Sequence, residues 1–146
     1  SGRKDKINLI IVIFLKFILG FLIVILTIHT LAVINNWYWT YRWMDMSMHF
    51  LGGLWLGLIF LYFIMPKLEI TSHKLLIEMI LIVSFAVFIG VLWEFFEFLF
   101  DVFLSSKGYF AAAQQGTGDT MSDLFFDLLG GFVAFNIYSF QLERNA

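Results

Sequence analysis

Four long apolar stretches constrain the fold of this chain more than any other feature of its sequence. They cover residues 7–34, 44–65, 74–104 and 119–141. Each is at least as long as the ~20 apolar residues that an α-helix needs to cross a bilayer. Hydrophobic residues make up 61% of the 146 residues and charged residues 14%, which leaves more apolar surface than a soluble domain of this length can bury. Lipid is therefore the expected solvent.

Helices are the expected secondary structure of all four stretches. An open sheet edge leaves backbone groups unsatisfied in lipid, and the stretches are too long for the strands of a membrane barrel. The first stretch is also too long for a signal-peptide core, so we expect it to remain as a span. The sequence predicts an all-α, polytopic integral membrane protein whose single domain, residues 1–146, is a bundle of four transmembrane helices.

The positive charges outside the spans predict the orientation. One side collects Arg3, Lys4, Lys6, Lys67, Lys74 and Arg144, and the other side collects Arg42 and Lys107. Because cytoplasmic loops carry the excess of Lys and Arg, both termini and the connection between the second and third spans are expected on the cytoplasmic side. The aromatic segment 35–43, NNWYWTYRW, then lies at the outer membrane–water boundary, where Trp and Tyr concentrate.

Three of the four predicted helices carry titratable residues at helical spacing. The sets are Asp45 and His49, then Glu94, Glu97 and Asp101, then Asp119, Asp123 and Asp127. With alternating helix directions, all three sets fall near the outer ends of their spans. At about 1.5 Å of rise per residue, His49, Glu97 and Asp123 come to similar depth. We expect the three sets to meet in one layer below the outer surface.

Such a layer needs a neutralising partner, because a charge at the bilayer centre costs about 2.5–3.5 kcal/mol even on the most lenient scale. Protons, a basic partner or bound cations would serve. Carboxylates with a histidine and no cysteine suit divalent Mn, Fe, Zn or Mg, and bridging carboxylates would allow two ions. The predicted metal ligands are Asp45, His49, Glu94, Glu97, Asp119, Asp123 and Asp127, and Asp101, His29 and Arg42 are further candidates.

Several polar residues also have simpler roles open to them. Asp119 follows a glycine at a helix start, so a helix cap and a metal ligand are alternatives. Asp45 has the alternatives of a cap or an ion pair with Arg42. Glu78 is expected to face solvent or to pair with Lys74.

The third connection, residues 105–118, lies over the predicted acid layer. It is rich in glycine near its end and contains no proline. A flexible cover, a re-entrant wall and an ordinary connection are alternatives. Gln114 and Gln115 would supply neutral hydrogen bonds at the mouth of the layer.

The segments MDMSMHFLGG, WEFFEF and QQGTGDTMSDLFFDLLGG, within residues 44–131, resemble the YjdF-like family of uncharacterised bacterial inner-membrane proteins. They are more distantly similar to VanZ-like membrane proteins. The resemblance implies that the seven predicted ligands form one set, and it implies no particular activity.

The predicted function is that of a metal-dependent membrane enzyme, a hydrolase or transferase, acting on a lipid or lipid-linked substrate. Membrane lipid is the expected partner, and self-association stays open. A net charge of −2 argues against nucleic acid. The alternatives are a proton or divalent-cation transporter or channel subunit, and a structural accessory protein whose metal locks the bundle. No catalytic residue is assigned from the sequence.

Overall fold

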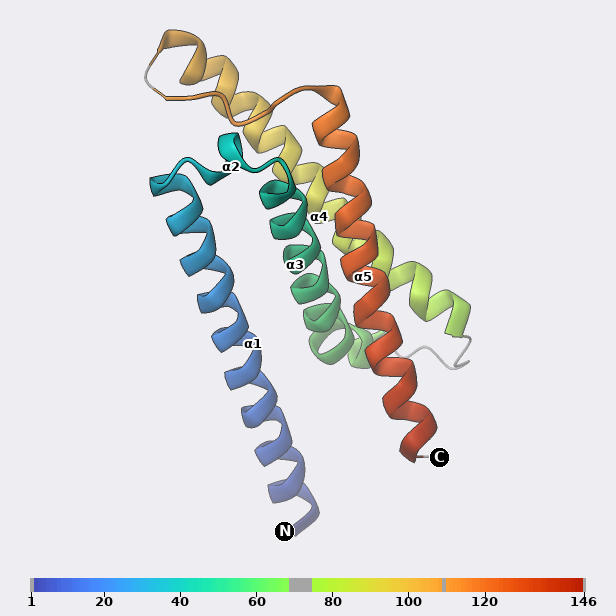
Figure 1. Cartoon of the computed structure of the whole chain (residues 1–146). Helices are drawn as coiled ribbons and strands as arrows, with labels where there is room; N and C mark the ends of the chain where they lie inside the picture. Colours follow the sequence, from blue (N-terminus) through green and yellow to red (C-terminus); the bar gives the residue numbers. More distant parts are fainter. Residues whose placement is uncertain (1, 69–74, 109, 146) are drawn as a thin grey trace.

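The apolar stretches form long helices in a computed structural model of the chain (Figure 1). The structure describes residues 2–68, 75–108 and 110–145, with side chains over 12–68, 75–108 and 110–140. Within these ranges there is no strand, and four helices are long and apolar enough to cross a membrane. The prediction of an all-α protein with four spans is confirmed.

The helix boundaries follow the predicted stretches closely. α1 covers Gly2–Ile34, and α2 is the single turn Trp37–Thr40. α3 covers Trp43–Ile59 and continues through a π-helical turn, Phe60–Ile64, into a 3-10 turn, Met65–Lys67, at Pro66. α4 covers Leu75–Phe103 and is followed by a 3-10 turn, Ser105–Lys107, while α5 covers Thr117–Asn145. The candidate membrane spans are Val12–Ile34, Trp43–Lys67, Leu75–Lys107 and Thr117–Phe140.

Glycines let α3 and α5 approach to backbone contact. A Cβ atom on Gly53 would stand 2.9 Å from the Asp127 Cα atom. On Gly130 it would stand 2.5 Å from the Leu54 amide nitrogen and would collide with the Phe50 carbonyl oxygen. Small residues are the usual means of close helix packing in lipid, where the hydrophobic effect does not drive helices together. This contact brings the acidic face of α5 against α3.

The inner half of the bundle is packed from small and branched side chains. Ile82 and Ala86 of α4 and Ala134 of α5 are fully buried, at 0% exposure. A Cβ atom on Gly57 would stand 2.6 Å from the Ala134 Cβ atom, and one on Gly131 would stand 3.1 Å from the Ala86 Cβ atom. The three helices α3, α4 and α5 therefore close tightly on the cytoplasmic side of the predicted topology.

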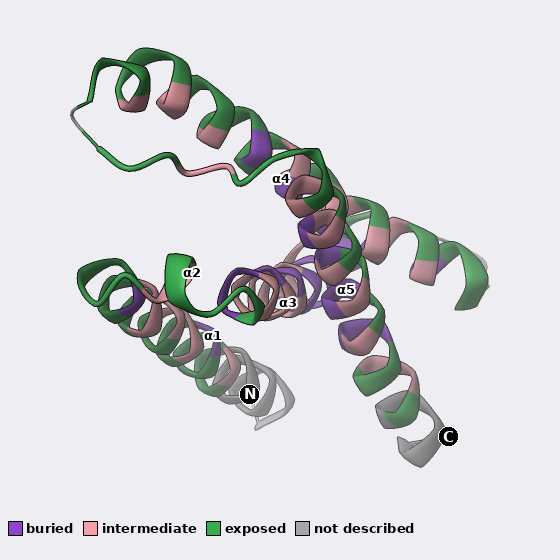
Figure 2. Cartoon of the chain, turned by 45° about the horizontal axis from the view of Figure 1, so that its top comes forward, coloured by how far each residue is buried: buried purple, intermediate pink, exposed green. Residues whose placement is uncertain are grey.

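α1 packs less closely than the other spans, and its main contacts are with α3 and α2. The Trp55 indole donates a hydrogen bond to the Ile18 carbonyl oxygen over 2.9 Å, and the Phe14 ring stacks on Tyr62 with centroids 3.5 Å apart. Figure 2 shows the buried residues gathered on α3, α4 and α5, with α1 separate from the outer part of α4. Large exposed side chains such as Ile23, at 64% exposure, suit a lipid-facing helix.

The connections sort to the two ends of the bundle. The start of α1 and the end of α5 lie at one end, and α2 and the segment 104–116 lie at the other (Figure 1). This agrees with the prediction that both termini share one side of the membrane. The choice of the cytoplasm for that side rests on the positive charges of the loops and stays a prediction.

Candidate metal centre

His49 lies at the contact between α3 and α5 and is 7% exposed. Its Nδ1–H donates a hydrogen bond to Asp127 Oδ2 over 3.1 Å. Gly90 of α4 leaves room for this carboxylate, because a Cβ atom there would collide with Asp127 Oδ2 and stand 2.8 Å from its Cγ atom. A carboxylate on one ring nitrogen orients the imidazole and presents the other nitrogen as a ligand.

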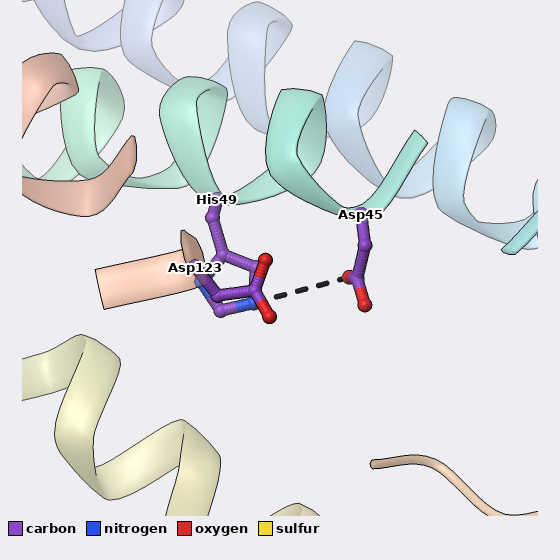
Figure 3. Close-up of side chains that lie close together, drawn as sticks. All are labelled: Asp45, His49 and Asp123. Carbon is purple, nitrogen blue, oxygen red and sulfur yellow. Dashed lines mark ion pairs between the residues drawn. The ribbon is translucent and has the colours of Figure 1, made fainter. Parts of the chain in front are cut away.

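The second ring nitrogen of His49 faces three further acids. Nε2 lies 3.9 Å from Asp45 Oδ1, one turn earlier in α3, and 3.9 Å from Glu94 Oε1 of α4. Asp123 of α5 completes the group, and one ligand atom from each of Asp45, His49 and Asp123 lies within 4.8 Å of the others (Figure 3). These four residues are called the His49 cluster below. Three helices thus place metal-binding groups around one point.

Two carboxylate oxygens of the His49 cluster are buried without a hydrogen-bond partner among the described residues: Asp123 Oδ1 and Glu94 Oε1. Asp123 is 1% exposed and Glu94 is 6% exposed. A buried polar group left unsatisfied costs about 1–3 kcal/mol, and more when it is charged. The donor set of carboxylates and one imidazole fits a divalent cation, which would satisfy these oxygens.

The connection between α4 and α5 holds the remaining oxygen of Glu94. Gln114 Nε2 donates to Glu94 Oε2 over 3.0 Å and also lies 3.3 Å from Thr120 Oγ1 on α5. Gln115 Nε2 donates to the Tyr38 carbonyl oxygen over 3.0 Å, which ties the same connection to α2. The prediction that these glutamines supply neutral hydrogen bonds at the mouth of the layer is confirmed.

The other predicted acids have partners of their own. Asp101 accepts hydrogen bonds from the Ala113 and Gln114 amides and from the Ser105 hydroxyl, at 2.6, 3.0 and 2.9 Å. Asp119 Oδ2 accepts a bond from the Gln115 amide over 3.1 Å, just before α5 begins. Between the two roles open to it, this contact favours a local backbone role for Asp119.

Glu97 lies one turn above Glu94 and is half-buried. Its Oε1 accepts a hydrogen bond from the Trp93 indole over 2.9 Å. From equal residue counts, Glu97 was expected level with His49, but the closer glutamate is Glu94. The reason is that α4 crosses behind α5 at a tilt, so equal rise along the helices does not give equal depth (Figure 1). Whether Glu97, Asp119 and Asp127 bind metal stays a prediction.

His29 and Arg42, the further candidates from the outer end, are not among the residues grouped around His49, although His29 lines the same cavity as Asp45 and His49. His29 Nδ1 lies 2.6 Å from the Tyr38 hydroxyl group. Burial raises the pKa of the Tyr38 phenol, and the nearby carboxylates of Asp45 and Glu97 raise it further. Arg42 is exposed, and the ion pairs found among the described residues do not include an Arg42–Asp45 pair.

Glu78 corrects one expectation. It is 2% exposed, whereas the sequence predicted a solvent-facing side chain or a pair with Lys74. Lys74 lies outside the described residues. The position of Glu78 in the first turn of α4 favoured an exposed side chain, but the structure buries it.

A cavity of about 570 Å³ opens beside the His49 cluster, between α1, α3, α4 and the segment 110–115. Its polar wall includes Asp45, His49, Glu97 and Asp127. Its other walls are mainly apolar, and they include Ile25, Leu56, Ile89, Phe96 and Phe100. The volume falls in the range of about 300–1,000 Å³ that is typical of small-molecule sites.

Sequence reasoning did not find two residues that shape the site. Tyr38 was hidden in an aromatic run that reads as an interfacial belt, although its hydroxyl contacts His29 and its carbonyl anchors Gln115. Gly90 makes room for the carboxylate of another helix, a role that helical spacing does not predict. The roles of Tyr38 and Gly90 depend on contacts between different helices, so they become visible only in the tertiary structure.

Comparison with known proteins places the chain in a membrane-protein context. Residues 9–144 match the family described as "Predicted membrane protein (DUF2238)". No curated protein and no solved structure matches the chain. The match supports the expected membrane location and covers all four spans.

Proposed function

The chain belongs to this DUF2238 family of membrane proteins, and we propose that it is a metal-dependent membrane enzyme, a hydrolase or transferase that acts on a lipid or lipid-linked substrate. In this proposal it lies in the bacterial cytoplasmic membrane, as the YjdF-like segments also suggest, with the His49 cluster toward the outer surface. The observation that carries the proposal is Asp123: a carboxylate 1% exposed, with an unpartnered oxygen, beside a histidine oriented by a second carboxylate.

The proposed ligands of one divalent ion are Asp45, His49 Nε2, Asp123 and Glu94. Such an ion supplies Lewis-acid polarisation of a phosphoryl or carbonyl group and activation of water at neutral pH. Imidazole among carboxylates favours Mn, Fe or Zn over Mg. A second ion, which the number of carboxylates predicts, would draw on Glu97 or Asp127.

The chain's own residues have separate tasks in this proposal. Asp127 holds the imidazole of His49, and Gln114 holds Glu94 from the connection above. Glu97 also lines the cavity, and if it holds no second ion, its carboxylate would be free to exchange a proton with a bound substrate. Burial of the cluster excludes bulk water and strengthens its electrostatic interactions.

The packing of the inner half favours an enzyme over the transporter alternative. A transported ion needs polar groups on both sides of the membrane. Inward of His49, the contact of α3, α4 and α5 passes to Gly57, Ala134 and the fully buried Ile82. Glu78 is a further buried acid at the start of α4, but Ile82 and this small-residue seam separate it from the His49 cluster, which supports a site closed below.

Elemental analysis of the purified protein tests the metal centre. The wild type is expected to carry at least one divalent ion per chain, and Asp123→Asn and His49→Ala are expected to lose it. Asp119→Asn is the matched control, because asparagine still accepts the bond from the Gln115 amide. Wild-type protein without stoichiometric metal would overturn the proposal and would favour protonated carboxylates.

A second measurement separates catalysis from transport. Protein in vesicles of bacterial phospholipid is incubated with Mn²⁺, Zn²⁺ or Mg²⁺, and lipid products and ion flux are followed in the same sample. The proposal expects metal-dependent turnover of lipid that is absent with Asp123→Asn. Ion flux without lipid turnover would favour the transporter, and bound metal with neither activity would favour the structural accessory role.

A further inference from the structure

The cavity beside the His49 cluster extends along the helices as well as across them. On α3 its wall runs from Asp45 to Leu56, about 16 Å at the usual helical rise. On α4 it reaches inward to Ile89, and on α1 it reaches inward to Ile25. The cavity therefore begins at the level of the outer connections and continues below His49 into the apolar part of the bundle.

The lining of the cavity is divided by chemistry. The polar lining residues Asp45, His49, Glu97 and Asp127, with His29, Tyr38 and Gln115, belong to its outer and middle parts, and its inner end includes Ile25, Leu56 and Ile89. No Lys or Arg is among the described residues that line it. The cavity thus matches an amphiphile whose polar end lies at the acidic wall and whose apolar end points inward.

The position of the cavity between α1 and α4 gives such a molecule a route from the bilayer. α1 has its extended contacts with α2 and α3, and its lining residues face the cavity from the side opposite α4. Figure 2 shows α1 and the outer part of α4 apart from each other. An occupant can therefore enter from the membrane plane without unpacking the contact of α3 with α5.

We infer that this cavity holds one hydrocarbon chain of a phosphate-bearing membrane lipid, with the lipid head group beside the His49 cluster. The head-group assignment rests on the proposed metal centre, because a phosphate is attracted to an acidic wall only through a cation. The assignment of a hydrocarbon chain to the cavity rests on the volume, depth and apolar inner end of the cavity. A glycerophospholipid and a polyprenyl phosphate share this chemistry.

Gly52 offers a direct test. It lines the cavity, and a Cβ atom there would meet nothing within 4 Å. A side chain at this position would therefore start in open space, and leucine would occupy part of the cavity. Gly20 of α1 is the matched control, since a Cβ atom there also meets nothing within 4 Å and the residue does not line the cavity. Ile89→Trp is a second filling variant, at the inner end.

The experiment uses delipidated full-length protein in maltoside detergent and native mass spectrometry. Dioleoylphosphatidylglycerol and undecaprenyl phosphate are titrated in separate arms, each with and without Mn²⁺. The wild type is expected to retain one lipid per chain. Gly52→Leu and Ile89→Trp are expected to bind it about tenfold more weakly, the cost of overfilling a cavity, and Gly20→Leu to match the wild type. The lipid that binds more tightly identifies the kind of lipid whose hydrocarbon chain fills the cavity.

The outcomes separate this inference from the proposed function. Gly52→Leu should keep its full content of Mn²⁺, because Gly52 is not a ligand. Lipid retention that is unchanged in both filling variants, or absent from the wild type in both arms, overturns the inference even if metal is bound. Retention that is sensitive to Gly52→Leu but identical with and without Mn²⁺ supports the chain site and overturns its link to the metal centre.

Discussion

The outer and inner halves of the contact between α3, α4 and α5 are formed by the same three helices but differ in the side chains that they bury. The outer half buries Asp45, His49, Glu94 and Asp123, and two of their oxygens lack hydrogen-bond partners among the described residues. The inner half buries Ile82 and small residues at backbone contact, and the one acid it buries among the described residues is Glu78, at the start of α4. The difference shows that the inner half supplies the packing that holds an unfavourable outer half together.

The largest effect is expected from breaking the close approach of α3 and α5. Gly130→Ala should lower the free energy of unfolding by about 3 kcal/mol, because its Cβ atom would collide with the backbone of α3 at Phe50 and Leu54. Unfolding in mixed micelles of dodecyl sulfate measures this loss. Gly20→Ala, which meets open space, should leave stability unchanged or slightly raised. Equal tolerance of both changes would contradict the backbone contact between α3 and α5.

The next effect sharpens the contrast between stability and function. Asp123→Asn replaces a buried carboxylate with a neutral amide, so in metal-free protein it should raise the free energy of unfolding by about 1 kcal/mol. In Mn²⁺ the order should reverse, because only the wild type gains the free energy of binding. Thermal melting with and without the ion measures both. A wild type that is not stabilised by Mn²⁺, Zn²⁺ or Mg²⁺ would contradict the metal centre.

A smaller effect is expected from the residue that orients His49. Asp127→Asn should weaken metal affinity by about tenfold, because an amide is a weaker acceptor for the imidazole N–H group. Isothermal titration of the metal-free protein measures the change. A complete loss of metal would instead make Asp127 a ligand, in line with its prediction from the sequence. Asp101→Asn serves as the control, since Asp101 bonds the connection and not His49.

The smallest effect is expected at the connection above the cluster. Gln114→Ala removes the donor to Glu94 Oε2 and should cost about 1 kcal/mol of stability. Metal affinity should fall only a few-fold, because Glu94 keeps its place on α4. Gln115→Ala is the paired control, since it releases the same connection from Tyr38 without touching Glu94. Equal effects of the two changes on metal affinity would make the connection as a whole, and not Gln114, the support of Glu94.

The helices and the general location of the site were predictable from local pattern. Length and hydropathy identify each span, and acids four residues apart must share a helix face. The partners of each acid were not predictable in the same way. Asp127 and Asp123 lie one turn apart on α5 with the same chemistry, yet Asp127 bonds His49 Nδ1 while Asp123 has a buried, unpartnered oxygen.

The hydrogen-bond partners of Glu94 and Glu97 on α4 were likewise not predictable from the sequence. Both are glutamates in one predicted stripe, but Gln114 binds Glu94 and the Trp93 indole binds Glu97. The partner of each glutamate depends on the tilt of α4 against α5 and on the path of the connection between α4 and α5. Helical spacing predicts neither of these.

The sequence by itself determined that this chain has four helices long and apolar enough to cross a membrane and that most acids of three of them lie toward one end, because hydropathy and helical periodicity are local properties. Tertiary structure alone decided which of those acids surround His49, which serve the backbone, and that a cavity opens between α1 and α4 beside them. The physical reason is that helix tilt and the close approach at Gly53, Gly90 and Gly130 are set by contacts between segments distant in the chain.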